Sequence, residues 1–175
     1  MLWAKRRARA ESGARSEKEV RALIERLDIP EPWDRARFVE NVARVRGRAI
    51  TLMPVPAAIL ADNPCGLWLV REHDDIVLFE EGTSEYHADQ IIMHELGHMI
   101  LGHDKGAGDE GLARMAQPLL PHLDPATVRA ALGRTAYGEP REKEAELFAS
   151  LMMARPKEVK SESAPDFSRV FLKEE

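Results

Sequence analysis

The sequence predicts a single α+β domain, mostly helical, with a small three-stranded antiparallel or mixed sheet. Its 175 residues fit one domain with a core of its own. Two amphipathic helical patterns come first, and three short apolar runs follow at 49–55, 66–71 and 75–80. A long apolar helical stretch at 84–102 comes next. Helices, then a small sheet, then further helices are typical of an α+β rather than an α/β chain.

The first two helices are indicated by their caps and by their apolar periodicity. Ser16 and Glu19 have the spacing of a capping box, which opens the first helix. Asp34 is the expected cap of a second helix that runs through Arg46 and ends at Gly47. The residues expected to face the core are Val20, Leu23, Ile24 and Leu27, then Phe38, Val39, Val42 and Val45.

Three strands and a long helix are expected in the middle of the chain. Ala49–Val55 is the first predicted strand. Gly66–Arg71 and Asp75–Glu80 predict a hairpin, with the turn at His73 and Asp74. Ser84 is the expected cap of the long helix.

Two more helices are predicted in the second half of the chain. The first opens at Asp124-Pro125 and closes at Gly133. The second opens at Glu139-Pro140 and runs to about residue 154.

The two ends of the chain differ in composition from its body. Residues 1–15 hold a cluster of Lys and Arg, and residues 157–175 are charged and contain Ser and Pro. We expect a disordered basic N-terminal arm, a domain over 16–156, and a charged C-terminal tail. The net charge of −5 gives no sign of a nucleic-acid surface, so no direct contact with nucleic acid is expected.

Cysteine content and hydropathy favour a cytoplasmic protein. Cys65 is the one cysteine of the chain, which excludes an intramolecular disulfide framework and suits a reducing compartment. The N-terminus has no apolar leader pattern, and no apolar run reaches the length of a membrane span. Neither export nor membrane contact is therefore expected.

The long helix carries the pattern His-Glu-x-x-His at 94–98. His94 and His98 are four residues apart, so both imidazoles project from one helix face and suit two ligands of a Zn²⁺ ion. Glu95 is about 100° around the helix, where it can act as general base on a metal-bound water without being a ligand. Apolar neighbours predict that this helix is mostly buried, and buried polar groups need partners. A metal supplies them; the alternative interpretation is a satisfied core cluster.

The third ligand must come from elsewhere, because a catalytic zinc keeps three protein ligands. His103 lies about 140° off the ligand face, so we expect it to be a partly exposed histidine near the helix end. Glu142, on the last helix, is the favoured ligand. Glu146, one turn later, is expected to accept the outer N–H of a zinc-bound imidazole, with Glu144 at the surface. The alternative is a solvated acidic strip.

The segment at 94–103, followed by Glu-x-Glu-Ala-x-x-Phe-Ala at 142–149, resembles the ImmA/IrrE family of bacterial gluzincin-like metallopeptidases. The resemblance covers about 85–155 and implies a zincin-like fold with one Zn²⁺ per chain. By this resemblance the ligands are His94, His98 and Glu142, and Glu95 is the base.

The same family implies a cytoplasmic endopeptidase. Several of its members cleave a helix-turn-helix repressor encoded beside them, so a repressor of this kind is the expected partner. Cys65–Trp68, Leu123–Pro125 and Gly133–Tyr137 are similar to an actinobacterial branch described as toxins or regulators.

Zinc-dependent peptide hydrolysis also needs a donor for the developing oxyanion. Tyr137, just before the last helix, is the first candidate, and packing at a helix entry is the alternative role for it. The other candidates are His103, His122, Tyr86 and His87.

Two other functions remain open at this point. One is a non-catalytic zinc-holding sensor or binding module that regulates a repressor by contact. The other is the toxin component of a toxin–antitoxin pair, which differs from the peptidase mainly in its target.

Overall fold

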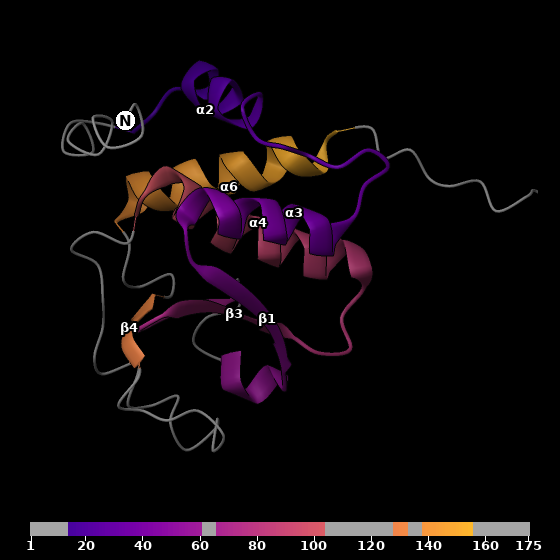
Figure 1. Ribbon diagram of the computed structural model, residues 1–175, viewed down its shortest axis with the longest axis vertical. Coiled ribbons are helices and arrows are strands. Elements are labelled where there is room, and N and C mark those ends of the chain that lie inside the picture. Colours follow the sequence, from indigo (N-terminus) through magenta and orange to yellow (C-terminus); the bar gives the residue numbers. More distant parts are fainter. Residues whose placement is uncertain (1–13, 61–65, 104–127, 133–137, 156–175) are drawn as a thin grey trace, which may run out of the picture.

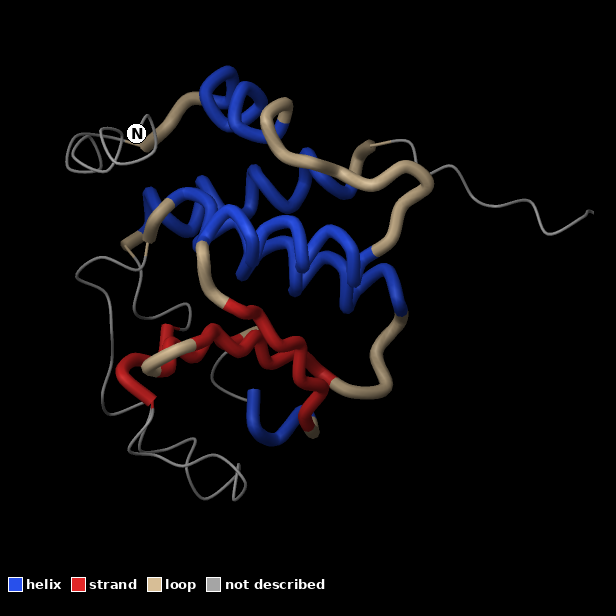
Figure 2. Tube along the Cα trace, in the orientation of Figure 1, coloured by secondary structure: helices blue, strands red, loops and turns tan. Residues whose placement is uncertain are grey.

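Helices stack over one face of a β-sheet in this protein (Figures 1 and 2). The computed structural model describes residues 14–60, 66–103, 128–132 and 138–155. In chain order the elements are α2 (Glu17–Ile24), α3 (Arg35–Arg46), β1 (Ala49–Val55), η2 (Ala57–Leu60), β2 (Leu67–Arg71), β3 (Asp74–Glu80), α4 (Glu85–Leu101), β4 (Val128–Leu132) and α6 (Glu139–Met153). They confirm the predicted single α+β domain.

The strands of the described residues form one mixed sheet of four strands, in the order β1-β3-β2-β4. β1 runs parallel to β3, while β2 runs antiparallel to both β3 and β4. The predicted hairpin is therefore confirmed as β2 and β3, with Leu67 opposite Leu78. Because β1 joins β3 in parallel, the sheet is mixed rather than purely antiparallel.

The helix predicted between Asp124 and Gly133 is wrong, because Val128–Leu132 form strand β4 and give the sheet a fourth strand. β4 pairs with β2 over Trp68 to Arg71. Without β4, the outer edge of β2 would present a row of unpaired backbone N–H and C=O groups. Pairing with this edge overrides the local preference of a short segment, as tertiary context often does.

α4 lies between α6 and the sheet. It contacts α6, α3 and β3, and α2 packs on the outer side of α6 (Figure 1). α3 contacts β1, so α3 and α4 together cover one face of the sheet. η2 contacts β3 and lies on the opposite face (Figure 1). The helix that carries the His-Glu-x-x-His motif is thus enclosed by other elements.

Apolar side chains pack on both faces of the sheet. The larger cluster lies between helices and sheet and contains Phe38, Trp68 and Phe148. The smaller one is made of Val55, Leu60, Leu67, Leu69, Ile76 and Leu78. Every residue of α4 from Ile91 to Leu101 is buried, which confirms the prediction that this helix is mostly buried. No helix within the described ranges is both long and apolar enough to span a bilayer.

The predicted helix caps are confirmed, although α2 ends at Ile24, before the predicted Leu27. Ser16 opens α2 with a capping box. Asp34 accepts a hydrogen bond from the backbone of α3, and Ser84 accepts one from the backbone of α4. Gly47 and Gly102 end α3 and α4 in the left-handed conformation, with φ of 70° and 75°, which glycine adopts without strain.

The prediction that Val45 faces the core is wrong, since its side chain is 49% exposed. Arg46 takes the inward position instead. Its guanidinium lies 3.0 Å from the buried Asp75 carboxylate, covers the Trp68 ring and donates to the Met99 carbonyl oxygen. A buried carboxylate needs such donors. Arg46 thereby connects α3 to β2, β3 and α4.

Candidate metal centre

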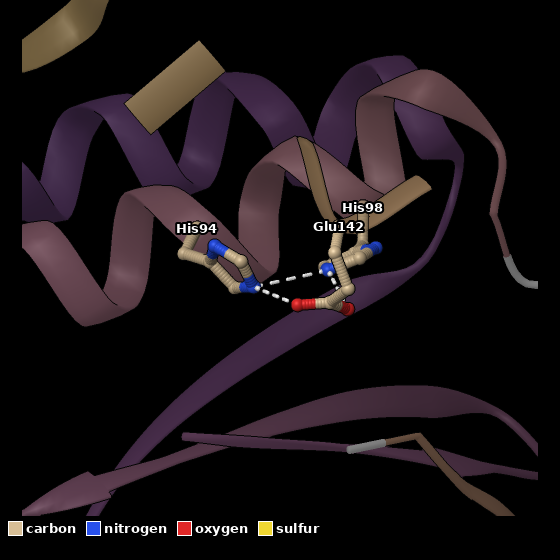
Figure 3. A group of neighbouring side chains, drawn as sticks. All are labelled: His94, His98 and Glu142. Atoms are coloured by element: carbon tan, nitrogen blue, oxygen red, sulfur yellow. Dashed lines mark hydrogen bonds and ion pairs between the residues drawn. The ribbon is translucent and has the colours of Figure 1, made fainter. Parts of the chain in front are cut away.

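Three polar side chains from two helices converge at one point. His94 and His98 lie one turn apart on α4, and Glu142 lies in the first turn of α6. Figure 3 shows the carboxylate of Glu142 facing both imidazole rings. Among the described residues, these are the side chains whose ligand atoms could hold a metal ion, all within 4.8 Å of one another. The sequence predicts the same three residues as ligands.

Small residues at the contact allow α4 and α6 to approach closely. A Cβ atom at Gly97 would lie 3.0 Å from Phe148 Cδ1 and 3.3 Å from the Ala145 carbonyl oxygen. Ala145 and Ala149 are buried at the same contact, as their small size predicts. The sequence reasoning missed Gly97, because it occupies a variable position of the motif. Its small size brings Glu142 within reach of the two histidines.

The distances between the three ligand atoms fit a tetrahedral metal ion. His94 Nε2 and His98 Nε2 are 3.1 Å apart. Glu142 Oε2 lies 3.6 Å from His94 Nε2, and Glu142 Oε1 lies 3.3 Å from His98 Nε2. Ligand bonds of 2.0–2.1 Å at tetrahedral angles would separate neighbouring ligand atoms by about 3.3–3.4 Å. Only small side-chain adjustments would be needed to bind Zn²⁺.

The protonation states also suit a metal. Burial lowers the pKa of His98 to about 4, so its imidazole is neutral at neutral pH. Burial alone would raise the pKa of Glu142, but the side chains of His94 and His98 outweigh this effect and lower it to about 2. Neutral imidazole and ionised carboxylate are the ligand forms that metals bind.

Two carboxylate oxygens at the centre are buried without a hydrogen bond. Glu95 Oε2 and Glu142 Oε1 are buried and have no hydrogen bond from any described residue. Burial and the nearby Glu142 carboxylate raise the pKa of Glu95 well above its usual value. A buried polar atom without a partner costs about 1–3 kcal/mol. A metal ion at Glu142 and a bound water at Glu95 would satisfy both atoms, so the residues present fit the predicted metal.

Gly66, the residue before β2, lies against the predicted base. Its φ of 105° is in the region that favours glycine. A Cβ atom there would lie 2.7 Å from Ile91 Cγ2 and 3.2 Å from Glu95 Oε1. Sequence reasoning did not assign it to the site, although a glycine that opens a predicted strand often marks a close approach of backbone to another group.

The predicted role of Glu146 is wrong. Glu146 is exposed, whereas α6 buries Ala145, Phe148, Ala149 and Met152. At 100° per residue, Glu142 lies about 70° from the centre of this buried stripe and Glu146 about 110° from it. The extra 40° carries Glu146 into solvent, away from the imidazoles.

His103 and Glu144 are buried, although the sequence predicts a partly exposed histidine and a surface carboxylate. Their exposed fractions are 2% and 5%. His103 Nδ1 lies 2.9 Å from His98 Nδ1, and His103 Nε2 lies 3.2 Å from Glu144 Oε2. α4 ends at Gly102, and His103 N–H donates to the His98 carbonyl oxygen, so the chain reverses there. This reversal places the His103 side chain against α4. Gly102 was the sequence signal that the helix ends before His103.

Arg15, the last residue of the predicted basic arm, completes this group. Its backbone N–H donates to Glu144 Oε1 at 2.5 Å, and its guanidinium donates to Glu144 Oε2 at 2.6 Å. The same guanidinium donates to the Leu101 carbonyl oxygen at 3.0 Å. Burial would raise the pKa of Glu144, but His103 and Arg15 outweigh it and lower the pKa to about 2.

None of the oxyanion-donor candidates within the described residues lies at the centre. Tyr137 and His122 lie outside the described residues. Tyr86 and His87 are exposed in the first turn of α4, about 10–12 Å along the helix axis from His94. His103 faces the outer side of His98 rather than the three ligand atoms.

The candidate metal centre therefore consists of two histidines, one carboxylate ligand and a buried carboxyl group beside them. No protein-family model, curated protein or solved structure matches the chain.

Proposed function

We propose that the protein is a zinc-dependent endopeptidase of the cytoplasm, with a zincin-like active site. The observation that carries the proposal is a His94–His98–Glu142 triad of tetrahedral spacing beside Glu95, whose carboxyl is buried and lacks a hydrogen-bond partner on Oε2 among the described residues. Three ligands leave a fourth position open, which is typical of catalytic rather than structural zinc.

Each residue has a distinct role in this proposal. His94, His98 and Glu142 would hold the ion, which when bound supplies a Lewis acid that polarises a carbonyl and acidifies water. Glu95 takes a proton from the attacking water on its free oxygen and delivers it to the leaving amine. Its raised pKa suits a group that must hold this proton between the two steps. Its burial keeps bulk water from competing for the proton.

The substrate we propose is a protein, specifically a helix-turn-helix repressor encoded near this chain. Support comes from the resemblance of residues 94–103 and 142–149 to ImmA/IrrE peptidases. The chain would act on such a repressor directly, without binding nucleic acid or a membrane itself.

The test is a Glu95→Gln variant, compared with the wild-type chain after both are loaded with zinc. We expect Glu95→Gln to bind zinc as wild type does and to lose cleavage of the co-expressed repressor by at least about 10²-fold, because the amide cannot accept the proton. Mass spectrometry of the repressor measures the cleavage. Cleavage by Glu95→Gln at the wild-type rate would exclude this mechanism.

A zinc-holding sensor is the second candidate, and the burial of the centre favours it. His98 is 0% exposed and Glu95 2%, as in a site that is closed to substrates. In this case the repressor would be bound but remain full length, and Glu95→Gln would bind it equally well.

A toxin would differ in target: expression would arrest growth, and Glu95→Gln would abolish the arrest.

A further inference from the structure

A buried chain of hydrogen-bonding groups leads away from the metal centre on its outer side. It begins at His98 Nδ1, which lies 2.9 Å from His103 Nδ1. It continues from His103 Nε2 to Glu144 Oε2 at 3.2 Å. It ends at Arg15, which donates to both oxygens of the Glu144 carboxylate. None of these three outer residues has a ligand atom in the triad.

Metal binding at His98 determines which ring nitrogen of His98 and of His103 carries a proton. If Nε2 of His98 holds the ion, its ring proton is on Nδ1. His103 Nδ1 must then accept that proton's hydrogen bond, so the ring proton of a neutral His103 is on Nε2. That N–H in turn needs an acceptor, and the Glu144 carboxylate is one. The order of groups in the structure therefore matches the order that a metal-bound His98 requires.

The reverse order of donors and acceptors would prevent His98 from binding a metal through Nε2. If His103 donated from Nδ1, His98 would accept on Nδ1 and carry its proton on Nε2, pointing at the ion. An arginine beside the carboxylate opposes this reversal, because it holds Glu144 in the form that accepts hydrogen bonds.

We propose that His103 is a positioning residue for the metal ligand His98, and that Glu144 and Arg15 hold His103 in place. The inference rests on the metal centre of the proposed function. Partners that fix the tautomer and orientation of a liganding histidine are usually carboxylates or carbonyls. Here a second imidazole stands between the ligand and the carboxylate.

Arg15 also connects the metal centre with the segment that precedes α2. Its guanidinium donates to the Leu101 carbonyl oxygen at the end of α4 as well as to Glu144 on α6. One side chain thus connects the segment before α2 with both helices that carry ligands. Loss of this arginine should weaken metal binding although it lies outside the triad.

Zinc affinity of the full-length chain, measured by competition with a chromophoric chelator, tests the proposal. We expect His103→Leu to bind zinc about 10- to 100-fold more weakly, as for other partners of liganding histidines. His103→Asn should retain most of the affinity, because its amide oxygen can accept from His98 Nδ1. Arg15→Gln should show a smaller loss. His73→Ala, at an exposed histidine, is the matched control and should bind as wild type.

A second measurement reads the tautomers directly in the wild-type chain. In long-range ¹H–¹⁵N spectra of the zinc-loaded chain, we expect the proton of His98 on Nδ1 and that of His103 on Nε2. His103→Asn identifies the His103 signals. A His103 proton on Nδ1, or wild-type affinity in His103→Leu, would overturn the proposal. Absence of zinc from wild type would instead overturn the proposed function itself.

Discussion

At the scale of single residues, the centre holds groups that burial makes costly. Glu95 has a raised pKa and an oxygen that receives no hydrogen bond from the described residues, in a stretch of α4 that is buried from Ile91 to Leu101. A residue selected for stability alone would be apolar at this position. Its presence is the kind of local cost that functional sites carry.

This cost predicts that Glu95→Leu raises the thermal stability of the metal-free chain. Leucine has a similar volume and removes the unpartnered carboxyl, whose burial costs about 1–3 kcal/mol. For a chain of this size the midpoint of thermal unfolding should rise by roughly 3–10 °C. Calorimetry in the presence of a chelator measures it. An equal or lower midpoint would indicate that Glu95 has a stabilising partner in the folded chain.

The four residues proposed for catalysis could be predicted from the sequence, because their spacing on a helix determines which way they point. His94, Glu95 and His98 follow from the helical period, and Glu142 from the need for a third ligand. The outer partner of the histidines could not be found in the same way.

Glu146 was wrongly predicted as the hydrogen-bond partner of a zinc-bound imidazole. It is 40° around the helix from Glu142, and at the border of a buried face this rotation places its side chain in solvent. His103 and Glu144 were misplaced for another reason. Extending α4 through residue 103 puts His103 on the wrong side, whereas Gly102 ends the helix and turns the chain back.

At the scale of elements, Gly66, the residue before β2, lies against α4 beside the proposed base. Gly66 and Gly82 both adopt positive φ, at 105° and 75°. A Cβ at Gly66 would lie 2.7 Å from the side chain of Ile91, while a Cβ at Gly82 would have nothing within 4 Å. The two glycines therefore separate the effect of crowding from that of backbone strain.

We predict that Gly66→Ala destabilises the chain by about 1–3 kcal/mol more than Gly82→Ala does, since overpacking adds to the shared cost of positive φ. Chemical denaturation of both variants measures the difference. Gly66→Ala should also lower cleavage, because Ile91 and Glu95 must shift together. Equal stability of the two variants would mean that the backbone at Gly66 does not pack tightly against α4.

Most elements could be predicted from local patterns, since caps and glycine stops define α2, α3 and α4 in the sequence itself. β4 could not, because the sequence of Val128–Leu132 has no strong strand pattern and its structure depends on the open edge of β2. Val45 was misplaced because the periodicity of apolar residues ignores Arg46. That arginine turns inward for an acid, Asp75, that lies on another element.

At the scale of the whole molecule, metal binding should stabilise the fold. The ligands come from α4 and α6, which are far apart in the chain but pack against each other. An ion that bridges them binds the folded chain better than the unfolded one.

We predict that zinc at 100-fold above its dissociation constant stabilises the chain by about 2.7 kcal/mol. This corresponds to a rise of about 5–10 °C in the thermal midpoint. A chelator should reverse the rise. Glu142→Ala should show little of it, because only the two histidines of α4 would remain as ligands. An equal rise in both chains would mean that zinc stabilises them at another place.

The most direct test of the metal centre is the zinc content of the purified chain, with two variants of the same helix. Glu142→Ala removes a proposed ligand, and Glu146→Ala removes an exposed glutamate one turn later. We predict about one zinc per chain in wild type and in Glu146→Ala, and little in Glu142→Ala. Absence of zinc from wild type, or equal zinc in all three proteins, would contradict the account.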